Sequence, residues 1–158
     1  MGKIGVCLSG CGVNDGAEIH ESVITALTLD KAGAEILFTA PNMEQSKVVN
    51  HLTGDEMGES RNVLVESARI ARGDIIDLAE LTANNMDALI FPGGFGAVLN
   101  LCDFALKDAD CDIHPEVNRI IQEMLKANKP LGFICIAPAL FARRSEERRV
   151  GKECRSRW

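Results

Sequence analysis

Short apolar runs alternate along this chain with amphipathic stretches and Gly-rich turns, which is the pattern of an α/β domain. The runs that predict strands are KIGVCLS at 3–9, AEILFTA at 34–40, the apolar part of DALIFPGG at 87–94, and LGFIC at 131–135. The stretches that predict helices start near Asp15 and end at Gly33, cover about 59–72, and cover 115–127. Because strands and helices alternate, the sheet should be mostly parallel, with helices on both of its faces.

The spacing of apolar residues indicates which face of each helix is apolar. In the first helix, apolar side chains fall on one face at Ile19, Val23, Ala26 and Leu27. The helix at 115–127 has the clearest pattern, because Pro115 occupies its first position and apolar residues then recur at helical spacing. These residues are Val117, Ile120, Ile121, Met124 and Leu125.

Composition and charge narrow the class of protein. The 158 residues allow one domain, and 46% of them are hydrophobic. The net charge is −6, but residues 143–158 hold seven of the 17 basic and three of the 23 acidic residues, so residues 1–142 carry ten basic and 20 acidic. This acidic balance argues against nucleic acid or an anionic membrane as a partner. Without a signal peptide or an apolar span of membrane length, we expect a cytoplasmic protein with free thiols.

The basic stretch at 143–158, RRSEERRVGKECRSRW, differs from the rest of the chain. It lacks the periodicity of a helix or a strand, and it resembles translated vector sequence. We therefore interpret 1–142 as the native domain, which ends near Ala142, and 143–158 as a non-native basic tail. A native arm that binds nucleic acid is the alternative interpretation of this stretch.

Three unusual turns should meet at the carboxyl edge of a parallel sheet, where α/β proteins place their sites. They are Ser9–Gly16, Pro92–Gly96 and Cys135–Pro138. Cys135 stands where a buried strand turns sharply into a predicted helix, which is the position of a nucleophile elbow. Phe133 and Ala137 occupy the places where that motif usually has Gly, so a packed core cysteine fits the spacing equally well.

The other two turns supply candidate groups around this thiol. Gly93 and Gly94 allow the backbone to direct amides toward the same edge, so the N–H groups of Gly94 and Ile136 are candidates for an oxyanion hole. A purely structural turn is the alternative. Glu18 and Glu21 lie near the start of the first helix, where the helix dipole favours acidic residues whether or not they act in chemistry. His20 is interpreted as a solvated or packed side chain.

Several of these motifs together resemble a known family. IGVCLSGCGVNDGAEIHESV, NHLTG, ESRNVLVESARIARG, ALIFPGGFGA and KPLGFICIAPA are similar to the enhancing-lycopene-biosynthesis family of isoprenoid-associated glyoxalases, across residues 2 to about 142. That family belongs to the PfpI-like superfamily, which also contains class I glutamine amidotransferase domains. The resemblance implies a flavodoxin-like three-layer sandwich in which Cys135 pairs with Glu21, and not with Glu18.

The same resemblance implies a function and a length. It implies a glyoxalase-type lyase that needs no cofactor, with Cys135 and Glu21 as catalytic residues and Gly94 and Ile136 as the oxyanion hole. The substrate would be glyoxal or a similar small 2-oxoaldehyde, without metal, glutathione or nucleotide, and the full-length protein would be a homodimer. Members of the family continue beyond the position of Ala142. We therefore expect an incomplete sheet at the C-terminus and a chain that is poorly soluble or partly molten, and inactive.

Other interpretations of the motifs are weaker. GCGVNDG after a first strand has some likeness to a dinucleotide fingerprint, but Asp15 stands at the third Gly position, where its charge would repel pyrophosphate. Cys7 and Cys11 lack a second pair at zinc spacing, and Cys102 and Cys111 are interpreted as bystanders. The alternative function is a redox-sensing or regulatory protein of the same superfamily, in which Cys135 is oxidised without turnover.

Overall fold

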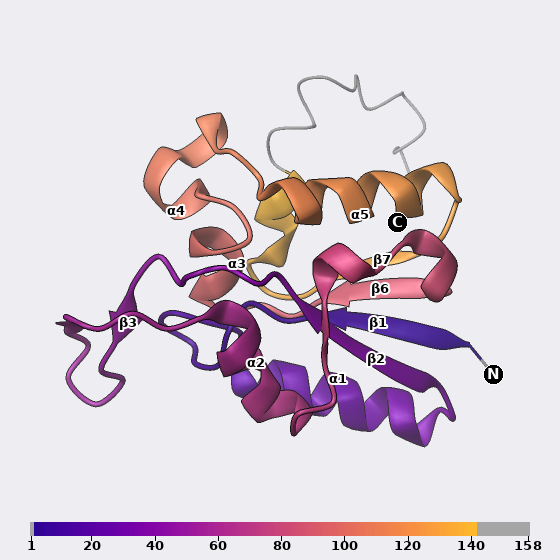
Figure 1. Ribbon diagram of the computed structural model, residues 1–158, viewed down its shortest axis with the longest axis horizontal. Coiled ribbons are helices and arrows are strands. Elements are labelled where there is room, and N and C mark those ends of the chain that lie inside the picture. The colour runs from indigo at the N-terminus through magenta and orange to yellow at the C-terminus, as the bar shows by residue number, and fades with distance from the viewer. Residues whose placement is uncertain (1, 142–158) are drawn as a thin grey trace, which may run out of the picture.

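The computed structural model describes residues 2–141 (Figure 1), so the stretch interpreted as a non-native tail, 143–158, lies outside the described residues. Five strands form one parallel sheet in the order β5-β2-β1-β6-β7. They are β1 (Lys3–Cys7), β2 (Glu35–Ala40), β5 (Ile76–Asp77), β6 (Ala88–Phe91) and β7 (Leu131–Phe133). Two short strands, β3 (Val48–Val49) and β4 (Glu56–Met57), pair separately in an antiparallel hairpin. The predicted α/β fold with a parallel sheet is confirmed.

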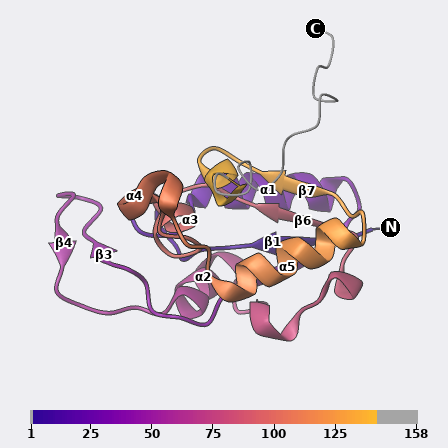
Figure 2. The ribbon, with the colours of Figure 1, turned by 90° about the horizontal axis from the view of Figure 1, so that it is seen from above.

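Helices cover both faces of the sheet, and Figure 2 shows α1 and α5 on opposite sides of it. The α-helices are α1 (Ile19–Lys31), α2 (Val63–Ala71), α3 (Phe95–Leu99), α4 (Phe104–Lys107) and α5 (Pro115–Lys126). Short 3-10 helices are η1 (Leu78–Glu80), η2 (Ala83–Asn85), η3 (Asp108–Asp110) and η4 (Ala137–Phe141). None of the helices within residues 2–141 is long and apolar enough to span a membrane.

Alternate residues of each strand enter different cores, because successive side chains point to opposite faces. Cys7, Leu89 and Phe91 are fully buried on the face that α5 covers. Val6 and Leu8 are fully buried on the face that α1 and α2 cover. Two cores separated by one sheet make the three-layer sandwich that the family resemblance implied.

The helix α5 forms as its sequence predicts. Pro115 occupies the first turn, where its missing N–H costs nothing, and Lys126 lies in the last turn. The apolar stripe is buried at Val117, Ile120, Ile121 and Met124. Each Å² of apolar surface that is buried stabilises the fold by about 25 cal/mol. Burial of this apolar stripe is therefore the main contribution of α5 to the stability of the fold.

Two predictions about the other helices are corrected. α2 begins at Val63 and not near residue 59, because the Asn62 side chain accepts the amide of Val65 and caps the helix there. In α1, the predicted apolar face does not pack on the sheet: Ile19, Val23 and Leu27 are 43%, 47% and 49% exposed. The helix instead approaches the sheet with Ser22, which is fully buried, and with Leu29.

Candidate active site

Cys135 lies on an exposed turn directly after β7, and its backbone has a φ of 56°. Residues other than Gly rarely adopt this left-handed conformation, which costs about 1 kcal/mol or more and persists where the surroundings impose it. The amide of Ile134 donates to the Phe91 carbonyl at 3.0 Å, which fixes the start of the turn to the end of β6. The alternative of a packed core cysteine is wrong, because the residue is exposed.

The element after Cys135 differs from the expectation. An α-helix was predicted to begin there, but η4 is a 3-10 helix that covers Ala137–Phe141. The amide of Ala137 donates to the carbonyl of Ile134 at 3.0 Å, so the chain tightens immediately around the thiol. A strained backbone turn therefore positions Cys135. The dipole of a short 3-10 helix stabilises a thiolate less than the dipole of a long α-helix does.

Gly93 connects the thiol to the first turn of α1. Its N–H donates to Oε2 of Glu21 at 2.7 Å, and its carbonyl accepts the amide of Glu18 at 2.8 Å. A Cβ at this position would lie 2.6 Å from that Glu21 oxygen and 2.7 Å from Cβ of Cys135. The carboxylate of Glu21 and the side chain of Cys135 therefore converge on the same Gly93 backbone, which only glycine can provide.

Glu18 has a different task from Glu21. Its side chain accepts the backbone amide of Glu21 at 2.7 Å and contacts Nδ1 of His20 at 3.0 Å, so it caps α1. Partial burial tends to raise the pKa of the Glu18 carboxyl, but the amide of Glu21 and the His20 side chain outweigh it, and the pKa lies below its ordinary value. Of the two acids, Glu21 is the one that reaches the turn beside Cys135.

The predicted oxyanion donors lie on the two turns that flank the thiol. Gly94 has a φ of 94° and is the N-cap residue that precedes α3, and a Cβ on it would clash with the backbone of Gly16 and Glu18. Among the residues that the structure describes, the amides of Gly94 and Ile136 have no hydrogen-bond partner. Unpaired backbone amides next to an exposed thiol are what an oxyanion hole requires, and this role stays a prediction.

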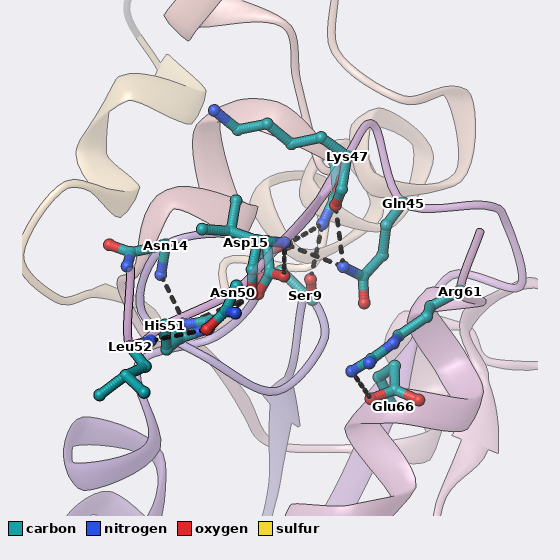
Figure 3. Close-up of polar contacts among 12 residues, drawn as sticks. Ser9, Asn14, Asp15, Gln45, Lys47, Asn50, His51, Leu52, Arg61 and Glu66 are labelled. Carbon is teal, nitrogen blue, oxygen red and sulfur yellow. Dashed lines mark hydrogen bonds and ion pairs between the residues drawn. The ribbon is translucent and has the colours of Figure 1, made fainter. Parts of the chain in front are cut away.

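A buried polar cluster behind the turn after β1 was not predicted (Figure 3). Asp15 is 4% exposed, and its Oδ2 accepts the amide of Val49 at 2.8 Å. The side chain of Asn100 donates to the carbonyls of Ser9 and Asp15, each at 2.9 Å. Asp15 was interpreted as part of a helix start, but α1 begins at Ile19, and Asp15 instead ties the β1 turn to β3.

His51 makes hydrogen bonds to two backbone groups at the edge of the same cluster (Figure 3). Its Nε2 accepts the amide of Asn14 at 3.1 Å, and its Nδ1 lies 3.0 Å from the carbonyl of Val49. The first contact requires a bare Nε2, so Nδ1 carries the proton and donates to the carbonyl. These contacts join segments far apart in the sequence, and the polar run NHLTG at 50–54 carries no periodicity that would place it here.

The thiols differ in accessibility. Cys7 and Cys102 are buried, Cys11 is half-buried, and Cys135 is exposed. Burial raises the pKa of Cys7, and burial together with the nearby Glu66 carboxylate raises that of Cys11. Within residues 2–141 there is no group of three or more His, Cys, Asp or Glu side chains that could hold a metal ion.

The chain is similar to several known proteins. No protein-family model matches the chain. It is 51% identical over 154 residues to the human mitochondrial glutamine amidotransferase-like class 1 domain-containing protein 3, which covers 96% of this chain and 58% of that protein. The chain therefore spans somewhat more than half the length of this curated relative.

Two solved structures have folds similar to that of this chain. An isoprenoid biosynthesis protein with an amidotransferase-like domain from Ehrlichia chaffeensis has 38% identity and a TM-score of 0.86, over 92% of this chain and 69% of its own. A ThiJ/PfpI domain protein from Brachyspira murdochii has 16% identity and a TM-score of 0.53, over 91% of this chain and 64% of its own, and this likeness shows the fold alone.

Proposed function

The chain belongs to the family of isoprenoid biosynthesis proteins with an amidotransferase-like domain, in the class I glutamine amidotransferase-like superfamily, and we propose that this protein is a cofactor-independent glyoxalase. The substrate is glyoxal or a similar small 2-oxoaldehyde, and the product is a 2-hydroxy acid. The observation that carries the proposal is the convergence of Glu21 and Cys135 on Gly93, because this reaction needs one nucleophile and one proton carrier at adjacent positions.

The first step is addition of the thiol to the aldehyde. The Cys135 thiolate attacks one carbonyl carbon of glyoxal, forming a C–S bond and converting the C=O group to an alkoxide. The amides of Gly94 and Ile136 hold the developing oxyanion, which then takes a proton to give the hemithioacetal. The exposure of Cys135 supports this step, because the aldehyde has access to sulfur without movement of the core.

The second step moves a proton between adjacent carbons. The Glu21 carboxylate removes the hydrogen from the carbon bonded to sulfur, giving an enediol, and returns a proton to the neighbouring carbon. The product is a thioester of Cys135 with a hydroxymethyl group. The hydrogen bond from the Gly93 amide to Oε2 supports this role, because it orients the carboxyl and leaves Oε1 as the oxygen that takes the proton.

The third step is hydrolysis. Water adds to the thioester carbonyl, the C–S bond breaks, and glycolate leaves while the thiol is restored. Over the whole cycle, one glyoxal and one water give one glycolate and one proton, without net oxidation or reduction. The reaction therefore needs no added oxidant, reductant or cofactor.

The test measures glycolate formed from glyoxal in buffered D₂O. It uses this 158-residue chain and a version extended to the length of its relatives. We expect the extended version to form glycolate that carries deuterium on its hydroxymethyl carbon, and we expect no glycolate from this chain or from the Cys135→Ser and Glu21→Gln variants of the extended version. Turnover that Cys135→Ser retains would overturn the proposal. Glycolate without deuterium would show that the hydrogen migrates without exchange, or as hydride, and would overturn the role of Glu21 as a solvent-exchanging proton carrier.

A second candidate function has one observation in its favour. The exposed Cys135 on a strained turn is also accessible to peroxide, and the adjacent Glu21 carboxyl could hydrogen-bond a sulfinate. This redox-sensing function predicts that peroxide adds two oxygen atoms to Cys135 selectively, while glyoxal is not turned over. Mass spectrometry of peroxide-treated protein, together with the glycolate assay, separates the two functions.

A further inference from the structure

Two other cysteines lie at the ends of the segment that carries α4 and η3. Cys102 precedes α4 and Cys111 follows η3, and their exposed fractions are 3% and 0%. An isolated antiparallel bridge brings the two ends together. Cys102 forms a bridge with Ile113, and the amide of Asp103 donates to the carbonyl of Asp112 at 3.1 Å. Cys111 precedes Ile113 by two residues and has an extended backbone, so its side chain lies on the same side of this bridge as those of Ile113 and Cys102.

The two thiols lie close enough to interact. The Cys102 thiol is in hydrogen-bond contact with that of Cys111, and its Sγ also lies 3.4 Å from the carbonyl of Ala97. Burial, followed by the Cys111 thiol and the Asp103 carboxylate, raises the pKa of Cys102 to about 11, against a lowering by the amide of Phe104. The Cys102 thiol thus stays protonated and unreactive while the segment remains closed.

The segment between the two cysteines lies outside the parallel sheet. Its residues at 105–108 are exposed, and α4 lies beside α3 at the edge of the molecule (Figure 1). Ion pairs from Nζ of Lys107, at 2.6 Å from Asp103 and 3.1 Å from Asp112, hold the segment together with the packing of Phe104 against the core. The ion pairs contribute little to stability, so local opening of this edge segment, which admits a small reagent to the thiols, costs mainly the packing of Phe104.

We propose that Cys102 and Cys111 form a reversible intramolecular disulfide, a modification site separate from Cys135. The oxidant is a low-molecular-weight disulfide. One protein thiolate attacks it, forming a mixed disulfide and releasing one small thiolate. The second protein thiol loses its proton and attacks the mixed disulfide, forming the S–S bond and releasing the other small thiolate. Two electrons pass from the protein sulfurs to the oxidant, and the two protons leave with the two small thiols.

The positions of the basic residues make the product easy to identify. Lys107 lies between the two cysteines, so trypsin cuts the segment and separates them. The peptide 73–107 then contains Cys102 as its single cysteine, and the peptide 108–119 contains Cys111 as its single cysteine. After cleavage these peptides stay together only through the disulfide.

The experiment incubates the full chain with glutathione disulfide, blocks the remaining thiols in acid and denaturant, and maps tryptic peptides by mass spectrometry. We expect the linked pair 73–107 and 108–119, equal loss of free Cys102 and Cys111, and recovery of both after dithiothreitol. Cys102→Ser and Cys111→Ser should each abolish the linked pair, whereas Cys11→Ser should retain it. The proposal is overturned if glutathione adds to one of the two thiols without cross-linking, if either links to Cys135, or if both remain free after Cys135 has fully reacted.

Discussion

The Gly93 amide donates to the Glu21 carboxylate at 2.7 Å, which joins the turn after β6 to the first turn of α1. The carbonyl of the same glycine accepts from Glu18, so both ends of this residue are held by one helix. Small changes at this position should therefore affect Glu21 and Cys135 together, which makes it the most direct point at which to test the arrangement.

Gly93→Ala should disrupt this arrangement while leaving the rest of the fold in place. The new methyl group would lie 2.6 Å from Glu21 and 2.7 Å from Cys135, so both side chains must move. We expect a loss of about 1–3 kcal/mol in the free energy of unfolding, measured in urea, and a changed alkylation rate at Cys135. Gly58→Ala is the matched control, because a Cβ there meets nothing within 4 Å. Equal effects from both variants would contradict the proposed contact.

Cys135 should be the first thiol to react. Iodoacetamide labelling followed by peptide mapping, repeated over a range of pH, measures the rate at each cysteine. Burial raises the pKa of Cys7, Cys11 and Cys102, so these thiols should label slowly near neutral pH. Faster labelling of any of these three at neutral pH would show that the elbow does not present the reactive thiol.

Glu21→Gln and Glu18→Gln should separate the roles of the two acids. In a protein extended to the length of its relatives, Glu21→Gln should abolish glycolate formation and leave a thiol that iodoacetamide still alkylates. Glu18→Gln should keep turnover and weaken the start of α1, at a cost of about 1 kcal/mol or less. If the two variants lost turnover equally, the pairing of Glu21 with Cys135 would be wrong.

The Glu18 carboxylate should make stability depend on pH. Its pKa in the folded protein lies below the ordinary value, so the unfolded chain binds more protons as the pH falls. This contribution is fully present above the ordinary pKa of Glu, about 4.3, and is lost as the pH falls through the folded pKa. Urea unfolding between about pH 7 and pH 3 should show a shallower acid loss in Glu18→Gln than in the parent. Glu56→Gln, on the exposed β4, should leave the pH profile unchanged.

Asp15→Ala should destabilise the turn after β1. Its carboxylate accepts the amide of Val49 in a buried setting, and removal leaves that amide unpaired. We expect a loss of about 1–3 kcal/mol in the free energy of unfolding. The control Asp55→Ala changes an exposed acid whose side chain has no hydrogen-bond partner among the described residues, and it should change stability little. Hydrogen exchange at the Val49 amide gives a local readout, which should accelerate in the first variant.

The elements that the sequence predicted well are those whose pattern is local. α5 carries a regular apolar stripe behind Pro115, and the helix forms where the stripe lies. In α1 the apolar residues indicated the wrong face, because the helix approaches the sheet through the small, buried Ser22. Periodicity identifies an amphipathic helix, but it does not distinguish a face that meets the sheet from one that faces outward.

The candidate site was likewise predicted only in part. The parallel sheet predicts that turns after β1, β6 and β7 meet at one edge, and the structure places them there. The contact between Asp15 and Val49 could not be predicted, because the two residues are far apart in the sequence and neither has a local signature. The position of Glu21 relative to Gly93 depends on how α1 packs, so the residues themselves did not distinguish Glu21 from Glu18, and only the family resemblance did.

The turns at this edge meet largely through main-chain atoms. The amide of Gly96 donates to the carbonyl of Gly16 at 2.9 Å, and the amide of Phe95 donates to the carbonyl of Val13 at 2.8 Å. The first of these contacts requires glycine, because a Cβ on Gly96 would lie 2.6 Å from the Gly16 backbone. The frame does not depend in the same way on the side chain that it displays at position 135, so a different nucleophile is accessible to such a fold by one substitution, whereas position 21 is tied to the frame through the Gly93 amide.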